Sequence, residues 1–229
     1  MSRGPASAGA SAHVLVASVD APELRPTDRH HLERVLRLRA GTVITVGNGA
    51  GSWCRVGLGA KLELLGDVQH DPADPNPITI GIALTKADKP ELAVQKLTEL
   101  GIDRILMFPS ARSVVRWEPE RIEAHMERLR RVAESAACQC RRSWLPDLLF
   151  ASSFSVATDL PSVALAAADG EQYDPIRHST ILVGPEGGWS PEELQVSLPR
   201  VALGPHILRA ETAAIAAGAV ASNARYFRL

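Results

Sequence analysis

The sequence has few cysteines and no long apolar run, and these absences exclude several classes of protein. Its three cysteines, Cys54, Cys138 and Cys140, are odd in number, and their spacing fits neither a disulfide framework nor a zinc site. We therefore expect reduced thiols, no metal and a cytoplasmic protein. The longest apolar stretch, 213–221, contains a glycine and is too short to span a bilayer, so no membrane association is expected. Residues 1–12 lack an apolar signal core and are expected to form a loose arm.

A strong excess of charge is also absent, since the net charge is -1 and by itself does not predict a nucleic-acid partner. The distribution of charge is uneven. Residues 25–61 hold seven basic against two acidic side chains, and residues 112–142 hold eight arginines against five glutamates. Local arginine patches are typical of phosphate contact. For the second patch, a solvated helix face with ion pairs explains the pattern equally well.

The segment 13–71 is predicted to be rich in short strands. A helix is expected over 28–38, with Thr27 or Asp28 as its cap. Gly47-Asn48-Gly49 is typical of a hairpin turn; it superficially resembles a dinucleotide-binding fingerprint, but it lies between two strand patterns. Several short strands with tight turns favour a small barrel. The expected strands are 13–19, 42–46, 53–58 and 61–69.

A stiff linker follows, because residues 71–77 contain three prolines, and it predicts a domain boundary. Beyond it, strand and helix patterns alternate over 77–229. This alternation predicts an α/β domain with a mostly parallel sheet, in which ligands bind at the carboxyl ends of strands. The expected strands are 78–84, 104–108, 180–183 and 201–203, and the expected helices are 90–100, 119–138, 191–197 and 211–226.

Three loops follow expected strand ends, and we expect them to converge on one pocket. They are the first loop (Thr85–Lys89), the glycine loop (Gly184–Ser190) and the third loop (Gly204–Thr212). The glycines allow close backbone approach to a ligand, although an ordinary strand-to-helix turn explains an isolated glycine pair as well. Ser190 is expected to cap a helix in a capping box with Glu193.

The third loop ends where the last helix is expected to begin. Glu211 and Thr212 lie at that start, where helix capping alone would explain both residues. The small residues that follow allow tight packing of this helix, and a plain buried helix is the alternative for that run.

Taken together, these segments resemble the RsmE-type family of bacterial 16S ribosomal RNA uridine-N3 methyltransferases, of the SPOUT class. The matching motifs occur in the family's order and span nearly the whole chain. They are His30–Arg39, Ala83–Lys89, Gln95–Gly101, Arg112–Val115, Val183–Gly188 and Leu203–Thr212.

The resemblance implies a PUA-like RNA-binding β-barrel over 13–71 and a SPOUT α/β methyltransferase domain with a deep trefoil knot over 77–229. It also implies S-adenosylmethionine as cofactor, 16S ribosomal RNA in the small subunit as partner, and a homodimer. The implied cofactor-binding residues are Leu84, Thr85, Val183, Gly184, Pro185, Glu186, Gly187, Gly188, Leu203, Gly204, Leu208, Thr212 and Ala213.

Methylation of uracil N3 requires alignment of the nitrogen with the methyl group and stabilisation of the uracil anion, a task that suits arginine. The candidate catalytic residues are Arg112, Arg142, Arg209 and Glu211, with Glu211 as proton acceptor or orienting group. Phosphate binding alone is the alternative for Arg112 and Arg142. The candidate RNA-binding residues are Arg25, Arg34, Arg37, Arg39, Lys86, Arg116 and Arg141.

The chain departs from the family pattern in three places, one of which is a cysteine in the segment 138–142, where a charged or polar residue is common. Ala87 stands where a glycine is usual, and the first strand begins with His13 in place of an Arg-Phe pair, with only the distant Arg3 basic. Two other functions remain open at this point. A non-catalytic RNA-binding or ribosome-assembly module could keep the same fold, and a nucleotide-cofactor oxidoreductase would require a fingerprint that the sequence lacks.

Overall fold

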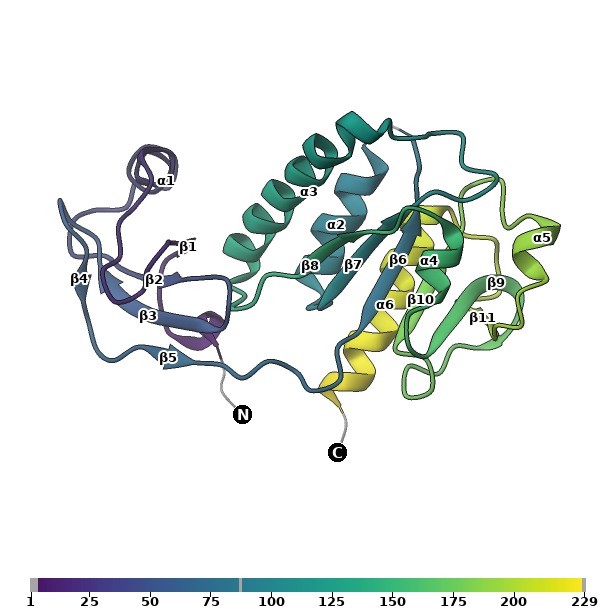
Figure 1. Cartoon of the computed structure of the whole chain (residues 1–229). Helices are drawn as coiled ribbons and strands as arrows, with labels where there is room; N and C mark the ends of the chain where they lie inside the picture. Colours follow the sequence, from purple (N-terminus) through teal and green to yellow (C-terminus); the bar gives the residue numbers. More distant parts are fainter. Residues whose placement is uncertain (1–3, 87, 228–229) are drawn as a thin grey trace. The chain divides into compact units, whose positions relative to one another are not determined.

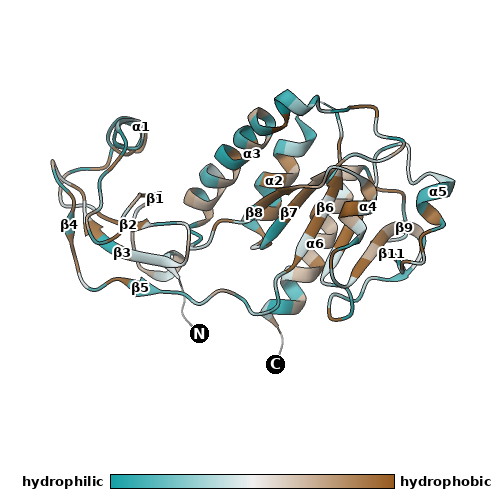
Figure 2. Cartoon of the chain, viewed as in Figure 1, coloured by the Kyte–Doolittle hydropathy of each residue, from teal (hydrophilic) through white to brown (hydrophobic). Residues whose placement is uncertain are grey.

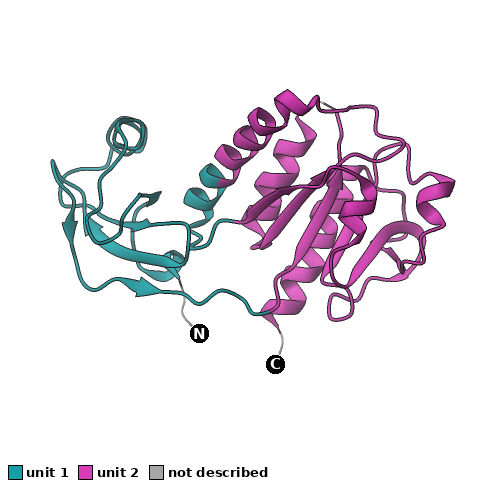
Figure 3. Cartoon of the chain, in the orientation of Figure 1, with its two compact units in different colours: residues 1–75, 134–145 teal, residues 76–133, 146–229 magenta. Residues whose placement is uncertain are grey.

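The structure is a computed structural model that describes residues 4–86 and 88–227, so Arg3 and Ala87 lie outside the described residues. The chain divides into two compact units (Figure 3). The first unit comprises Met1–Pro75 and Glu134–Leu145, and the second comprises Asn76–Ala133 and Pro146–Leu229. The chain therefore crosses between the units three times, which a single linker at 71–77 does not predict.

The first unit contains a five-stranded sheet. Its strands are β1 (His13–Leu15), β2 (Val43–Gly47), β3 (Ser52–Gly57), β4 (Glu63–Leu64) and β5 (Gln69–His70). They pair in the order β1-β2-β3-β4, with β5 also on β3. Among the described residues no pairing joins β1 to β4 or β5, so the sheet is not closed by its hydrogen bonds. The expected strand over 61–69 is split in two, with Gly66 at φ +127° between its halves.

Two predicted elements of the first unit, a hairpin turn and a helix, can be compared with the structure. The hairpin at Gly47–Gly49 is confirmed: β2 and β3 are antiparallel, and the Asn48 side chain accepts from Ala50 N (2.8 Å) and Ser52 N (3.1 Å). The expected helix over 28–38 instead begins at Pro26, as α1 (Pro26–His30), and continues as a π-helix, His31–Val35. Proline at the first helical position explains the earlier start, and Leu32 anchors the turn in the core at 1% exposure.

Residues 4–12 are packed, in contrast to the loose arm that was expected. Pro5–Ser7 forms a 3₁₀ turn, and Pro5, Ala10 and Ala12 are buried. Arg141 fixes this segment, since its guanidinium donates to Ala10 O (2.7 Å) and Ser11 O (3.2 Å). Residues 1–3 lie outside the described part of the chain.

The second unit contains a six-stranded parallel sheet in the order β11-β9-β10-β6-β7-β8 (Figure 1). The predicted mostly parallel sheet is therefore confirmed. The strands are β6 (Thr79–Ala83), β7 (Arg104–Phe108), β8 (Asp147–Phe150), β9 (Val163–Gln172), β10 (Thr180–Val183) and β11 (Arg200–Ala202). The sequence did not predict β8 or β9.

Two apolar cores cover the two faces of this sheet, as the alternation of side chains along each strand requires. In β7, Ile105 and Met107 join α2 (Lys89–Glu99), α3 (Pro119–Cys140) and α6 (Ala210–Tyr226) in one core, whereas Leu106 and Phe108 join α4 (Phe154–Thr158) and Trp189 in the other. The strands form the hydrophobic centre in Figure 2. The unit also contains α5 (Pro191–Leu194).

The helix predictions hold apart from two differences. Gly101 ends α2 with φ +80°, as its place in the sequence predicts. The unpredicted α4 lies between the unpredicted strands β8 and β9, and α5 is shorter than 191–197. No helix within the described ranges is both long and apolar enough to cross a bilayer.

Candidate functional site

The loops that follow the parallel strands leave the second unit's sheet at one edge, because all six strands run in the same direction. The glycine loop follows β10, and the third loop follows β11 and ends at α6. Between their strands lies β9, which pairs with both β10 and β11. A cavity of about 260 Å³ lies among these elements.

The lining of this cavity is mostly small and apolar, with one carboxylate. Its walls come from β9, the end of β10 with the glycine loop, the third loop and the start of α6. The lining residues are Ala166, Ala167, Ala168, Val183, Gly184, Pro185, Glu186, Gly188, Trp189, Leu203, Gly204, His206, Ile207, Leu208, Ala210 and Ala213.

Hydrogen bonds at its C-terminal end hold the glycine loop in place. Trp189 Nε1 donates to Ala166 O (2.9 Å), which ties the loop to β9, and the Trp189 ring stacks on Phe108 at 6.3 Å. The predicted capping box is confirmed, because Ser190 Oγ accepts from Glu193 N (3.2 Å) and Glu193 Oε2 accepts from Ser190 N (2.8 Å). Glu193 Oε1 also accepts from Ser110 Oγ (2.8 Å) and so fixes the loop after β7.

A charged cluster joins the first loop to the other two. Lys89, at the start of α2, forms an ion pair with Glu186 of the glycine loop, and its Nζ lies 3.9 Å from Glu211 Oε2 at the start of α6. The hydrogen bond from Lys89 lowers the pKa of Glu186 below its ordinary value, and the same bond raises the pKa of Lys89. Glu186 therefore stays ionised at the rim of the cavity.

The structure brings nine of the predicted cofactor residues to the cavity and leaves four outside its lining. Leu84 is buried in the core and its N–H donates to Phe108 O (2.9 Å). Thr85 is buried next to Leu84, and Thr212 is exposed on α6. Gly187 faces Arg112, since a Cβ added to this glycine would lie 3.2 Å from the Arg112 side chain. The described residues of the first loop therefore do not line the cavity. The wall expected from it comes from β9.

Sequence reasoning missed several lining residues. Ala166–Ala168 lie on β9, which is too rich in alanine to predict as a strand. Trp189 directly follows the two glycines, and this position could have indicated a lining residue, because a large aromatic ring has room to pack beside a glycine pair. His206, Ile207 and Ala210 lie within the predicted third loop.

Comparison with known proteins identifies the family. A family model described as an RNA methyltransferase domain matches residues 72–222. The ribosomal RNA small subunit methyltransferase E of Mycobacterium bovis is 32% identical over 83% of this chain and 82% of its own length. The chain belongs to the ribosomal RNA small subunit methyltransferase E family. The Bacillus subtilis member of this family is 29% identical over 80% of this chain and 82% of its own length.

Solved structures agree with this assignment to the methyltransferase E family. A Legionella pneumophila methyltransferase in complex with S-adenosylmethionine matches with a TM-score of 0.79 and 25% identity, over 93% of this chain and 97% of its own. The methyltransferase E of Neisseria gonorrhoeae, bound to S-adenosylmethionine, matches with a TM-score of 0.75, the same identity and the same coverage. The predicted α/β methyltransferase fold is thereby confirmed.

Three of the four catalytic candidates of this methyltransferase E family member belong to the unit that holds the cavity. Arg112 Nη1 donates to Gly187 O (3.1 Å), so its side chain lies against the glycine loop. Arg209 precedes α6, and Glu211 lies in its first turn. Arg142 belongs to the first unit, on the segment that follows α3.

The RNA-binding candidates fall into two groups. Arg25 and Arg141 have partners inside the first unit: Arg25 pairs with Asp28 (2.7 Å) and Glu134 (3.4 Å), and Arg141 holds the N-terminal segment. The other candidates are exposed, and within the described ranges none of them forms an ion pair. They are Arg34, Arg37, Arg39, Lys86 and Arg116.

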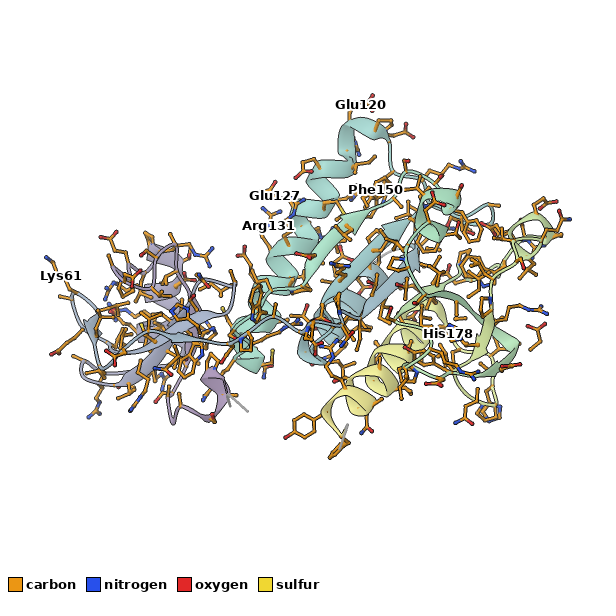
Figure 4. All side chains as sticks on the ribbon, turned by 60° about the horizontal axis from the view of Figure 1, so that its bottom comes forward. Lys61, Glu120, Glu127, Arg131, Phe150 and His178 are labelled. Carbon is orange, nitrogen blue, oxygen red and sulfur yellow. The ribbon has the colours of Figure 1, made fainter. Side chains whose placement is uncertain are left out.

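The part of the second arginine patch on α3 is an ion-paired helix face, one of the two explanations that the sequence left open. Arg128 pairs with Glu91 (2.9 Å), Arg130 with Glu123 (2.5 Å) and Arg131 with Glu127 (3.6 Å). Glu127 and Arg131 project together from α3 in Figure 4. As for metals, no group of His, Cys, Asp and Glu side chains suited to an ion occurs among residues 4–86 and 88–227.

Proposed function

We propose that this chain transfers a methyl group from S-adenosylmethionine to N3 of a uridine in 16S ribosomal RNA. The observation that carries the proposal is the cavity formed by β9, the glycine loop and the third loop, in a chain that is 32% identical to a methyltransferase E. The alternative is a non-catalytic RNA-binding module that retains the fold. It is less favoured, because an assembly factor has no need of such a cavity.

The residues of the cavity fit the cofactor. Glycines and alanines line most of its wall, so backbone groups can approach a ligand without an intervening side chain. Its volume of about 260 Å³ lies just below the range of about 300–1,000 Å³ that is typical of small-molecule sites. Glu186 supplies an ionised carboxylate to a ligand that carries a sulfonium and an ammonium. Of the four predicted residues outside the lining, the buried Leu84 and Thr85 would support the walls from within the core.

The chemistry needs charge stabilisation and proton transfer from the protein. When bound, S-adenosylmethionine supplies an electrophilic methyl group. Arg112 and Arg209 would stabilise the negative charge that spreads over the uracil oxygens as N3 loses its proton. Glu211 would accept that proton or orient the base. Arg142 would act with them or bind phosphate.

RNA binding is proposed for the first unit as a PUA-like barrel. Arg34, Arg37 and Arg39 are exposed there, and Lys86 and Arg116 are exposed on the second unit. Arg25 and Arg141 would act mainly by holding these surfaces in shape. A paired target base would have to be turned out of its helix to reach the cavity.

The remaining family features are also part of the proposal. A trefoil knot is supported by the position of β10 between β6 and β9, followed by α6, which returns to pack on β6 and α2. A homodimer is supported by exposed apolar side chains on and after α6, at Val220, Tyr226 and Phe227. A cytoplasmic site of action follows from the proposed ribosomal substrate.

Two measurements test the function. Calorimetry should show binding of S-adenosylmethionine, and incubation with small subunits from cells that lack the protein should yield 3-methyluridine in 16S RNA by mass mapping. Cofactor binding without methyl transfer to RNA would contradict the substrate. An absence of cofactor binding at high micromolar concentration would favour the assembly-module alternative.

A further inference from the structure

Lys89 occupies a central position among the three loops, although it does not line the cavity. It is the first residue of α2, and its ammonium lies between two carboxylates from distant parts of the chain. It forms an ion pair with Glu186, and its Nζ is 3.9 Å from Glu211 Oε2. Its side chain is 26% exposed and that of Glu211 is 12% exposed, so water screens this cluster only partly.

The two carboxylates need a cation between them. Glu186 lies in the glycine loop and lines the cavity, and Glu211 lies in the first turn of α6, which contributes Ala210 and Ala213 to the same cavity. Glu211 Oε2 is buried and has no hydrogen-bond partner among the described residues. Both carboxylates lie next to the Lys89 ammonium, and two like charges in a partly buried site repel when no cation lies between them.

Other charged groups near this cluster do not replace Lys89. Lys86 of the first loop and Arg209 before α6 both act on it at longer range, since Lys86 helps to lower the pKa of Glu186 and Arg209 opposes the protonation of Lys89. The dominant cause of the lowered pKa of Glu186 is its hydrogen bond to Lys89.

We infer that Lys89 is a positioning residue for the cofactor, which ties Glu186 to Glu211 and so holds the glycine loop against the start of α6. The inference rests on the proposed function, because it assigns Lys89 a role in binding S-adenosylmethionine. Lys89 keeps the Glu186 carboxylate ionised and aimed along the rim. Without Lys89, the carboxylate would gain a proton more readily and the loop would open.

Three variants separate this role from a general contribution to stability. Lys89→Met removes the charge at similar length, and Lys89→Arg keeps a cation that can bridge both carboxylates. Lys96→Met is the matched control, since Lys96 is on the same helix and pairs with Glu99 (2.9 Å) away from the cavity. Calorimetry with S-adenosylmethionine at pH 7.5 and pH 5, and the melting temperature, are measured for each variant.

Lys89→Met should weaken cofactor binding about tenfold or more at pH 7.5, because a charge-assisted hydrogen bond is lost. At pH 5 the affinity of Lys89→Met should fall slightly more than that of the wild type, since the loss of Lys89 returns the pKa of Glu186 toward its ordinary value. Lys89→Arg should recover most of the affinity, and Lys96→Met should bind like the wild type.

Two results would overturn the inference. One is wild-type affinity in Lys89→Met. The other is an equal loss in Lys89→Met and Lys89→Arg with the same pH dependence as the wild type, which would mean that Lys89 serves only the fold. A wild-type protein that does not bind S-adenosylmethionine at all would instead contradict the proposed function.

Discussion

At the scale of single residues, His13 shows how the first unit holds a histidine neutral. The ring is 4% exposed, and its Nδ1 lies 2.9 Å from Thr45 Oγ1. The Thr45 hydroxyl also lies 3.2 Å from Ala12 O, to which it donates. Burial, followed by the charge of Arg141, lowers the pKa of His13 to about 4. The buried Nε2, which has no hydrogen-bond partner in the described part of the chain, would be charged below that pH.

The lowered pKa of His13 predicts a loss of stability in mild acid. The unfolded chain binds this proton near pH 6.5 and the folded chain near pH 4, so stability is fully present above pH 6.5 and is lost as the pH falls toward 4. The free energy of unfolding should fall by roughly 2 kcal/mol from pH 7 to pH 5. Urea denaturation at several pH values measures this change.

A matched pair of variants isolates the contribution of His13. His13→Gln should lower the free energy of unfolding at pH 7 but flatten its slope between pH 7 and pH 5. His70→Gln, at an exposed position in the same unit, should leave the slope unchanged. An unaltered slope in His13→Gln would contradict the assignment of the effect to this ring.

The sequence predicted many residues of the candidate site, but not the contacts between residues that lie far apart in the chain. Glycines after strand ends are a local signal, and nine predicted residues line the cavity. The role of Lys89 is not local, because its partner Glu186 lies 97 residues further along the chain. The contact from Trp189 to Ala166 likewise depends on a strand pairing that local patterns do not specify.

At the scale of elements, the π-helix His31–Val35 and the residues after it form an exposed basic segment. Arg29 is held by Glu33 (2.9 Å) and Gly59 O (2.9 Å), so it braces the turn. Arg34 and Arg37 are exposed, and Arg37 has a left-handed backbone with φ +54°. Short π-helical turns often occur at functional sites. This arrangement makes Arg34 and Arg37 the sharpest test of RNA binding.

Arg34→Glu with Arg37→Glu should weaken RNA binding and leave the affinity for S-adenosylmethionine unchanged. The slope of log affinity against log salt should decrease in magnitude by about 1.5–2, because two phosphate contacts are lost. Filter binding at several salt concentrations measures this slope. Arg131→Glu with Arg177→Glu is the control of equal charge, at sites 66% and 75% exposed. Equal effects of the two pairs would mean that only net charge matters.

Elements with a strong local signal were predicted, and those without one were not. Proline at the start and glycine at the end bound α2, and a long periodic pattern marks α3. Strand β9 was missed because its sequence, Val-Ala-Leu-Ala-Ala-Ala-Asp-Gly-Glu-Gln, has little β-propensity. Its pairing with β10 and β11 makes it a strand, and this pairing is a tertiary effect.

At the scale of the whole molecule, the first unit is assembled from two separate parts of the chain. Glu134–Leu145 belongs to it, although α3 begins in the second unit. Several bonds hold this segment in place. Trp144 Nε1 donates to Asp71 O (3.0 Å), Leu145 N donates to Gly49 O (2.8 Å), and Gly51 N donates to Ser143 O (3.0 Å). The alternation of helix and strand predicted the fold class, but it did not predict that residues 134–145 belong to the first unit.

A fragment of residues 1–75 should therefore not fold cooperatively alone. Fusion of residues 134–145 to it through a flexible linker should restore a cooperative thermal transition, measured by circular dichroism. A fusion with the same residues in scrambled order should fail to do so. A cooperative transition in the fragment alone would show that residues 134–145 are dispensable for this unit.

The central position of β10 has a consequence for synthesis of the chain. Its neighbour β6 ends at Ala83, about a hundred residues before β10 begins. At roughly 5–20 residues per second, a translating ribosome needs about 5–20 s to cover that distance. Throughout this time one edge of β6 has no partner, and such an edge is open to pairing with other chains. The nascent protein is thus most vulnerable to aggregation between the release of β6 and the release of β10.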